Sequence, residues 1–153
     1  MIAVLQRVYS ATVYADGVLS GAIGKGLYIL LGVERGDEEA DAKVLAEKIS
    51  KLRIFSDDNG KMNLSVLDIG GSALVVSNFT LNANYSHGNR PEYLNSAPPA
   101  IANDLYLYFV DCLKTSVCKV ETGVFGADMR TEMSTDGPVT IVMHSDVLSG
   151  GKK

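Results

Sequence analysis

The sequence lacks the features that mark membrane-spanning and exported proteins. No run of residues approaches the roughly 20 consecutive apolar residues that a transmembrane helix requires. The chain opens with Met1-Ile2-Ala3-Val4, which leads directly into a strand-like pattern and not into a basic segment followed by an apolar stretch. We therefore expect a cytoplasmic protein that has no leader peptide and no contact with a membrane.

Residues that bind metals or act as nucleophiles are also scarce. Cys112 and Cys118 are the only cysteines, and their spacing does not predict a zinc site, so we interpret them as reduced core thiols. His87 and His144 are the only histidines, and both positions are more typical of surface residues than of catalysts. The chain contains no Gly-x-Ser-x-Gly, HExxH, P-loop or GxGxxG motif. We therefore expect no metal and no cofactor.

Composition places the chain among folded globular proteins. Its 153 residues are the length of one domain, and a chain of this size buries about two-thirds of its unfolded surface. The net charge of −4 argues against a protein that coats nucleic acid. It is compatible with a partner that is contacted at only a few phosphates.

Strand patterns outnumber helix patterns, which predicts an α/β fold: a single domain with a layered β-sheet and two main helices packed on the sheet. Asp16-Gly17 predicts a hairpin turn, and residues 27–33 form an apolar run typical of a central strand. The domain is expected to span residues 1–146, followed by a flexible C-terminal tail at 147–153. Further strands are expected at residues 2–9, 11–15, 18–23, 74–81, 117–122, 129–134 and 138–144.

Two segments have the apolar periodicity of helices. The first spans about 38–53, with Asp37 as its N-cap. The second opens at Pro98-Pro99. Residues 82–97, before the second helix, predict a long loop of the kind that is often functional in a compact domain. The expected apolar faces carry Leu45, Ile49 and Leu52 in the first helix, and Ile101, Leu105, Tyr108, Phe109 and Cys112 in the second.

Polar residues end the apolar run at 74–81. A buried polar group costs about 1–3 kcal/mol unless it is hydrogen-bonded. Ser77, Asn78 and Thr80 therefore either pair locally at the end of a strand or line a pocket.

Arg7 and Gly137-Pro138 each allow a structural and a functional interpretation. Arg7 shares a strand face with Ala3 and Leu5, so it either reaches water from an edge strand or supports a neighbouring loop through backbone carbonyls. Gly137-Pro138 before a strand is normally only a turn. An X-Pro bond can also be cis, which would aim two carbonyls in the same direction and make a rigid steric gauge.

Motifs at separated places make the chain resemble the D-aminoacyl-tRNA deacylase family over nearly its whole length. The segment Ser77-Asn78-Phe79-Thr80-Leu81 resembles the family's Ser-Gln-Phe-Thr-Leu, with Asn78 where glutamine is usual. The segment Gly137-Pro138-Val139-Thr140 matches the family's Gly-Pro-Val-Thr motif. The other matching segments are residues 1–8, 52–55, 61–65, 125–129 and 139–141.

The resemblance implies a homodimeric cytosolic esterase with the deacylase-family fold and with tRNA as its partner. It would hydrolyse the ester between a D-amino acid and the terminal adenosine of tRNA, and the family also accepts glycine on tRNA. In the family the Gly-Pro bond is cis and projects into the partner subunit's active site, where it rejects L-amino acids sterically. The resemblance thus assigns substrate binding and chiral selection to Gly137, Pro138, Val139 and Thr140, with Arg7 as a support.

The same resemblance assigns catalysis to Ser77, Asn78, Phe79 and Thr80, and the terminal adenine pocket to Phe125, Gly126 and Met129. Backbone N–H groups of Phe79 and Thr80 are candidates for an oxyanion hole. Thr80 would act either as a nucleophile or beside a ribose 2′-hydroxyl that helps to activate water. We favour the second route because no base lies near Thr80 in the sequence.

Two alternatives stay open. A related branch with a trans Gly-Pro bond edits L-alanine on mischarged tRNA, although Phe79 and Arg7 favour the D-specific branch. The chain could also be a non-catalytic nucleic-acid-binding protein on the same fold. The presence of the motif residues Ser77, Thr80 and Gly137-Pro138 argues against this alternative.

Overall fold

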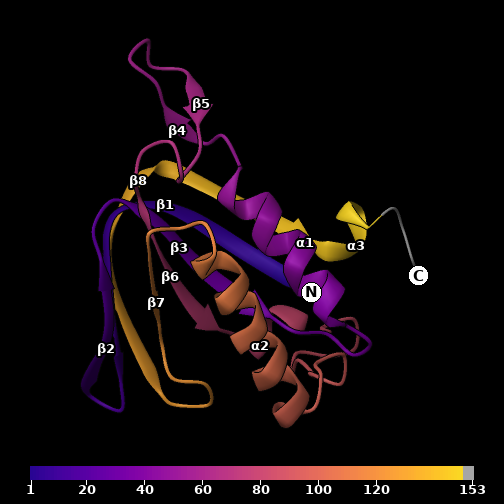
Figure 1. The fold of residues 1–153 in the computed structure, drawn as a ribbon. Coiled ribbons are helices and arrows are strands. Elements are labelled where there is room, and N and C mark those ends of the chain that lie inside the picture. The colour runs from indigo at the N-terminus through magenta and orange to yellow at the C-terminus, as the bar shows by residue number, and fades with distance from the viewer. Residues whose placement is uncertain (150–153) are drawn as a thin grey trace.

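The computed structural model describes residues 1–149, which form a mixed β-sheet with two helices on one face (Figure 1). The sheet has the strand order β2-β1-β3-β6-β7, and β8 pairs with β1 as well. A separate short hairpin of β4 and β5 projects from the body. The strands are β1 Ile2–Ala15, β2 Val18–Ile23, β3 Gly26–Gly32, β4 Phe55–Ser56, β5 Met62–Leu64, β6 Ser72–Ser77, β7 Lys119–Thr122 and β8 Met129–His144.

Strand β1 pairs with three other strands of the sheet, β2, β3 and β8. Its residues 2–8 pair with β3 and its residues 11–15 pair with β2, both antiparallel. Strand β8 pairs with the opposite edge of β1 along its whole length, with register shifts around Val8 that mark β-bulges. The expected hairpin turn is confirmed, since Asp16 and Gly17 have φ values of 48° and 81°, as a type I′ turn needs.

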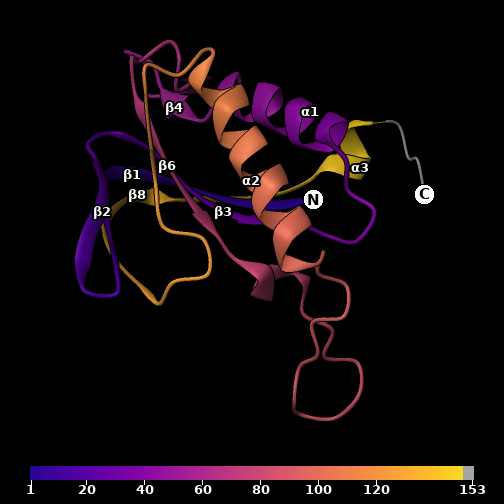
Figure 2. The ribbon, with the colours of Figure 1, turned by 60° about the horizontal axis from the view of Figure 1, so that its bottom comes forward.

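The two main helices, α1 Glu39–Ser50 and α2 Pro99–Lys114, lie together on one face of the sheet (Figure 2). They enclose the main core, in which Leu5 and Ile29 of the sheet pack with Phe109 of α2. A smaller core on the opposite side contains Val8, Val13, Tyr28, Leu74 and Val76. The predicted α/β fold with two helices on a sheet is therefore confirmed. Among residues 1–149, no helix combines the length and hydropathy needed to span a bilayer.

The expected helix caps and faces were wrong in part. Glu38 and not Asp37 is the N-cap of α1, and the Glu38 N–H donates to Asp41 Oδ2. Asp37 accepts instead from the Met1 ammonium at 2.7 Å and from the Glu34 N–H at 2.6 Å. Ile101, expected in the core, is 51% exposed, because α2 is rotated so that Ala102, Leu105, Tyr106, Phe109, Val110 and Leu113 are buried.

Three other expectations were wrong, and a fourth, the flexible C-terminal tail, stays a prediction. The strand expected at 74–81 ends at Ser77, and residues 79–82 form the 3₁₀ helix η1 Phe79–Asn82. The strands expected at 129–134 and 138–144 are one strand, β8, that runs through Gly137-Pro138. Cys118 is an exposed residue and not a core thiol. Of the expected tail, Val147 and Leu148 belong to the short helix α3 Ser145–Leu148, and residues 150–153 lie outside the described part of the chain.

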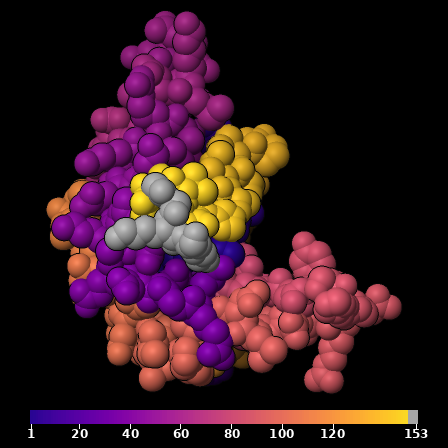
Figure 3. Space-filling model, turned by 90° about the vertical axis from the view of Figure 1, so that its right-hand side faces the viewer, coloured from indigo at the N-terminus to yellow at the C-terminus, as the bar shows by residue number. Residues whose placement is uncertain are grey.

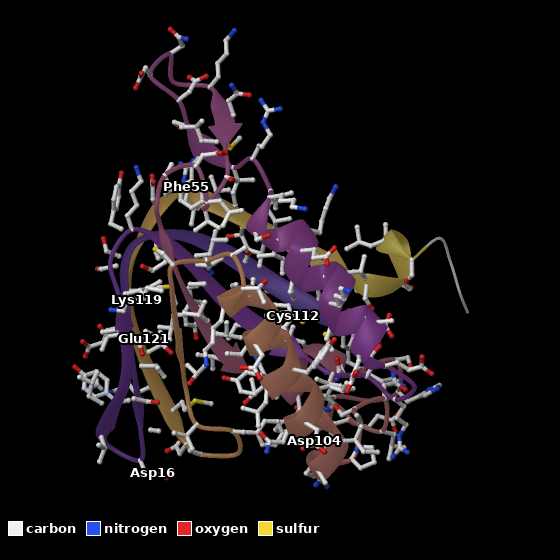
Figure 4. All side chains as sticks on the ribbon, in the orientation of Figure 1. Asp16, Phe55, Asp104, Cys112, Lys119 and Glu121 are labelled. Atoms are coloured by element: carbon white, nitrogen blue, oxygen red, sulfur yellow. The ribbon has the colours of Figure 1, made fainter. Side chains whose placement is uncertain are left out.

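Two arms extend from the body in the space-filling view of Figure 3. One is the β4–β5 hairpin, and the other is the loop between η1 and α2, which the sequence predicts as residues 82–97. Phe55, labelled in Figure 4, lies at the base of the hairpin. It is buried in the main core and so anchors that arm to the domain.

Candidate active site

A cavity opens where strand β7 leaves the edge of β6. The two strands pair from Ser72↔Lys119 to Val75↔Thr122, and the Gly123 N–H still donates to the Val75 carbonyl at 3.1 Å. Beyond that point the chain turns away and returns as β8. The space left beside the end of β6 has a volume of about 380 Å³, which is in the range of small-molecule sites.

The walls of the cavity are apolar and its mouth is polar. Leu30, Val76, Tyr106, Phe125 and Met129 line the interior, whereas Ser77, Asn78 and Ser96 supply polar groups. Six residues that the family resemblance assigns to the site meet here, and these are Ser77, Asn78, Phe79, Phe125, Gly126 and Met129. Thr80, the next residue of η1, does not line the cavity and is exposed.

Two tyrosines that sequence reasoning missed fix the walls. The Tyr106 hydroxyl donates to the Val75 carbonyl at 2.8 Å, and Tyr28 and Thr131 share a hydrogen bond of 3.0 Å between their hydroxyl groups. Burial raises the pKa of both tyrosines above the ordinary value, so both hydroxyls stay protonated. Their positions inside an apolar strand and an apolar helix face gave no signal of a site.

Asn78 caps the 3₁₀ helix that follows β6. Its Oδ1 accepts a hydrogen bond from the Thr80 N–H at 3.1 Å and a second, short one from the Thr80 hydroxyl. Asparagine is among the preferred N-cap residues because its side-chain oxygen reaches the free N–H groups of the first turn. Of the two N–H groups expected in an oxyanion hole, that of Thr80 is thus already bonded.

The Phe79 N–H, in contrast, has no acceptor among residues 1–149. The Phe79 carbonyl is bound, because Ser96 Oγ donates to it at 3.3 Å. Asn82 Nδ2 in turn donates to Ser96 Oγ at 3.2 Å and to the Val33 carbonyl at 2.8 Å. These contacts join η1 to the end of β3 and to the long loop, so the free N–H of Phe79 is held in place at the cavity mouth.

The Phe79 side chain packs against the long loop. It is 60% exposed, and its ring packs edge-on against Tyr93 with 5.0 Å between the ring centroids. The predicted long loop thus contributes Tyr93 and Ser96 to the site, although only the loop's length pointed to them. His87 and His144 are exposed and do not line the cavity.

The residues around Gly137-Pro138 form a second cluster on β8. The bond between them is cis, as the resemblance implies. Arg7 is only 8% exposed, and its guanidinium donates to the Asp136 carbonyl at 3.2 Å and to the Ile54 carbonyl at 2.7 Å. It also pairs with the Asp136 carboxylate at 3.1 Å. Of the two interpretations of Arg7, the structure therefore favours the second: its guanidinium binds backbone carbonyls beside Gly137-Pro138 and is buried.

The two clusters do not meet within one chain. Gly137, Pro138, Val139 and Thr140 are absent from the cavity lining. They lie beside Arg7, and the two residues that Arg7 binds, Asp136 and Ile54, are absent from the lining as well.

Residues 1–149 contain no group of three or more His, Cys, Asp or Glu side chains placed to hold a metal ion. The site offers hydrogen-bond donors, an apolar cavity wall and an exposed aromatic ring. Such a set can bind a planar base and stabilise a developing negative charge on an oxygen atom.

Comparison with known proteins gives consistent matches. The family model described as D-Tyr-tRNA(Tyr) deacylase matches residues 4–144. The D-aminoacyl-tRNA deacylase of Anaeromyxobacter dehalogenans (strain 2CP-C) is 52% identical over 145 residues, which cover 95% of this chain and 97% of that protein. The protein of the same name from Ruegeria pomeroyi is 54% identical over 143 residues, with 94% and 99% covered.

Many solved structures have a fold similar to that of this chain, and two of them show the range of sequence identity. One, described as c-Myc DNA Unwinding Element Binding Protein, has a TM-score of 0.88 and 36% identity and covers 94% of this chain and 98% of its own. The other, described as a probable eukaryotic D-amino acid tRNA deacylase, has a TM-score of 0.80 with 93% and 97% covered. Its identity is only 13%, so it supports the fold alone.

We expect Arg7→Lys to lower the free energy of unfolding by about 2 kcal/mol, because a lysine cannot bind the Ile54 and Asp136 carbonyls together as the guanidinium does. The matched control is Arg130→Lys, an exposed arginine paired with Glu132, for which a change within about 0.5 kcal/mol is expected. Urea unfolding at one fixed protein concentration measures both. Equal stability of Arg7→Lys and the unchanged protein would contradict the bracing role.

Proposed function

The chain belongs to the D-aminoacyl-tRNA deacylase family, and from this membership and the cavity beside β6 we propose that it hydrolyses the ester bond of D-aminoacyl-tRNA. The products are the free D-amino acid and tRNA. The single observation that carries the proposal is that Ser77, Asn78 and Phe79 share one cavity with Phe125 and Met129. Donors for the reacting carbonyl and an apolar wall for the base are thereby adjacent.

The terminal adenosine of tRNA is the part of the substrate that fits the cavity. Phe125 is half-buried and tilted against Tyr106 with 6.0 Å between the ring centroids, and Met129 lies beside it in the lining. An adenine stacks on such a surface and needs no large basic patch. The net charge of −4 is therefore compatible with a substrate held mainly at its 3′ end, and a cytoplasmic location follows from the same substrate.

A second subunit would complete the site. The exposed pair Gly137-Pro138 does not line the cavity of its own chain, so in a homodimer it would serve the cavity of the other chain. Strand β8 offers an apolar surface for this contact, since Val142 is 59% exposed next to the half-buried Val4. A C2 dimer formed through this face presents the same residues from both copies.

Chiral selection would follow from this arrangement. The carbonyls of Gly137 and Pro138 would bind the substrate amino group, which leaves an L side chain pointing into the main chain and a D side chain pointing away. A hundredfold preference needs only about 2.7 kcal/mol, which one steric overlap exceeds. Glycine has no side chain to exclude, so Gly-tRNA would also be hydrolysed.

The geometry around Thr80 favours hydrolysis assisted by the ribose 2′-hydroxyl. The Thr80 hydroxyl donates to Asn78 Oδ1, and no histidine or carboxylate among residues 1–149 accepts its proton. A nucleophilic threonine needs such a base. The ester is already activated, so positioning and oxyanion stabilisation can carry the reaction.

A nucleic-acid-binding function without catalysis is the second candidate, because a structure 36% identical to this chain is described as a DNA-binding protein. The neutral, largely apolar cavity offers nothing to duplex DNA. We therefore rank this candidate below the deacylase. Editing of L-Ala-tRNA also ranks below it, because Phe79 and Arg7 favour the D-specific branch of the family.

The proposal predicts hydrolysis of D-Tyr-tRNA and Gly-tRNA and stability of L-Tyr-tRNA and L-Ala-tRNA. Each charged tRNA is incubated with the protein, and the remaining ester is followed over time. Turnover of L-Ala-tRNA but not of D-Tyr-tRNA would favour the L-alanine editing enzyme. Binding of duplex DNA in a gel shift, with no turnover of any ester, would favour the second candidate.

Thr80→Ala is expected to keep kcat for D-Tyr-tRNA within about tenfold of the unchanged enzyme, because substrate assistance needs no threonine nucleophile. Single-turnover deacylation measures this rate. A loss of several orders of magnitude with unchanged substrate binding would show that the Thr80 hydroxyl attacks the ester.

Val142→Lys is expected to give a monomer that has lost deacylation, because a charge on the β8 face opposes dimer contact and the cavity then lacks the partner's Gly137-Pro138. The matched control is Val18→Lys at the tip of the β1–β2 hairpin, where Val18 is already 70% exposed. Analytical ultracentrifugation and the D-Tyr-tRNA assay test both variants. A fully active monomer would rule out the shared site.

A further inference from the structure

The long loop between η1 and α2 carries an exposed tip, residues 85–91, with the sequence Tyr-Ser-His-Gly-Asn-Arg-Pro. All seven residues are exposed, and the loop projects from the body beyond the N-terminal end of α2 (Figure 2, Figure 3). Tyr85 is 79% exposed, more than any other aromatic residue in the described part of the chain. Aromatic rings gain free energy when they leave water, so an aromatic ring exposed this far points to a binding surface.

The base of the tip is held by hydrogen bonds and is joined to the cavity mouth. The Asn84 N–H donates to the Glu92 carbonyl at 2.8 Å, and the Glu92 N–H donates to the Asn84 carbonyl at 2.9 Å. The next residue, Tyr93, packs its ring against Phe79, which lines the cavity. The tip is therefore presented beside the cavity on a closed turn of the chain.

The charge of the tip differs from that of the whole chain. The chain has a net charge of −4, whereas residues 85–91 include one arginine and no carboxylate. The nearest carboxylate in the sequence, that of Glu92, accepts from Asn84 Nδ2 at 2.7 Å and is thereby held at the base. Arg90 forms no ion pair within residues 1–149. The tip thus offers a free guanidinium and a free aromatic ring.

We propose that the tip binds the single-stranded RNA that precedes the terminal adenosine of the substrate, with Tyr85 stacked on a base and Arg90 bound to a phosphate. This inference rests on the proposed deacylase function. With the terminal adenosine in the cavity, the preceding nucleotides leave through the cavity mouth, where Phe79 and Tyr93 join the tip to the site. Stacking on an aromatic ring and contact with backbone phosphates are the usual means by which proteins bind single-stranded RNA.

The chemistry of this contact also fits a substrate class with many members. Every base has a face that can stack, and every nucleotide carries a phosphate, so neither contact depends on the RNA sequence. The tip would therefore contribute equally to the binding of tRNAs that carry different amino acids.

Two substrates of different length test the tip. D-Tyr-tRNA has the preceding nucleotides, whereas 3′-O-(D-tyrosyl)adenosine ends at the terminal adenosine. For Tyr85→Ala we expect KM for D-Tyr-tRNA to rise about tenfold with kcat unchanged, because a stacked base is bound equally in the ground and transition states. The value of kcat/KM for 3′-O-(D-tyrosyl)adenosine should stay within about twofold of that of the unchanged enzyme.

Two further substitutions of Tyr85 separate stacking from apolar contact. Tyr85→Phe keeps the aromatic face, so its KM for D-Tyr-tRNA should lie within about twofold of the unchanged value. Tyr85→Leu keeps an apolar side chain without that face, and its KM should resemble that of Tyr85→Ala. Equal values for Tyr85→Leu and Tyr85→Phe would show that no base stacks on the ring.

Arg90 is tested by the salt dependence of binding to uncharged tRNA. Loss of one phosphate contact to a single strand lowers the slope of log Kd against log salt concentration by about 0.7, and we expect this change for Arg90→Ala. The matched control is Lys114→Ala, an exposed cation at the C-terminal end of α2. At 1.5 Å per residue it lies about 22 Å from Pro99, so its slope should not change.

Three results would overturn the proposal. One is an equal loss on both substrates, which would mean that the tip acts through the structure of the cavity. Another is the absence of any loss with D-Tyr-tRNA. The third is a changed molecular mass of Tyr85→Ala in analytical ultracentrifugation, which would assign the tip to a contact between subunits.

Binding and hydrolysis can fail separately. If the unchanged protein cleaves neither ester but binds uncharged tRNA in a way that requires Tyr85 and Arg90, the deacylase function fails and the role of the tip stands. If it cleaves both esters and all variants match it, only the role of the tip is overturned.

Discussion

The backbone hydrogen bonds of strand β1 are the constraint on which the rest of the structure depends. A buried strand must satisfy the N–H and C=O groups of both edges. Strand β1 does so over residues 2–15 by pairing with β3 and then β2 on one side and with β8 on the other. The register shifts around Val8 mark bulges between these two long strands, and the sheet has a hydrophobic core on each face.

This arrangement also divides the functional residues into two groups. Strand β3 leads to the parallel strand β6, and the cavity forms where β7 stops accompanying β6. Strand β8, which pairs with the other edge of β1, contributes Met129 and Thr131 to the cavity near its start and carries Gly137-Pro138 further along. The separation of the two groups in one chain therefore depends on where along β8 each residue lies. In the proposed dimer, two-fold symmetry brings the groups together without any change in either chain.

Local patterns in the sequence were sufficient for most of the fold. The hairpin at Asp16-Gly17, the run at 27–33 and both helices depend on short-range rules that the residues themselves carry. Asp37 and Ile101 were misplaced because their partners are distant in the chain. The Met1 ammonium draws Asp37 away from the helix, and the sheet selects which face of α2 is buried.

The site was predictable to a similar degree. The polar residues after Val76 stood out in the sequence pattern, the residues near Phe125 were implied by the family resemblance, and the structure places both sets in one cavity. Local pairing and pocket lining were set as alternatives for Ser77, Asn78 and Thr80, yet Asn78 does both. Which of its atoms is free depends on the turn at η1, and no sequence pattern contains that information. Tyr106 and Ser96 depend in the same way on tertiary contacts.

The bracing of Asp136 by Arg7 has an evolutionary consequence. Arg7 connects β1, β8 and the Ile54 carbonyl, and none of these contacts involves a wall of the cavity. Under the proposed function, substitutions that reshape the adenosine cavity leave unchanged the Gly137-Pro138 segment that distinguishes D from L substrates. Substitutions around Gly137-Pro138 likewise leave the cavity unchanged. The range of accepted substrates and the fidelity of chiral selection can then diverge independently among relatives, because each is inherited on its own set of residues.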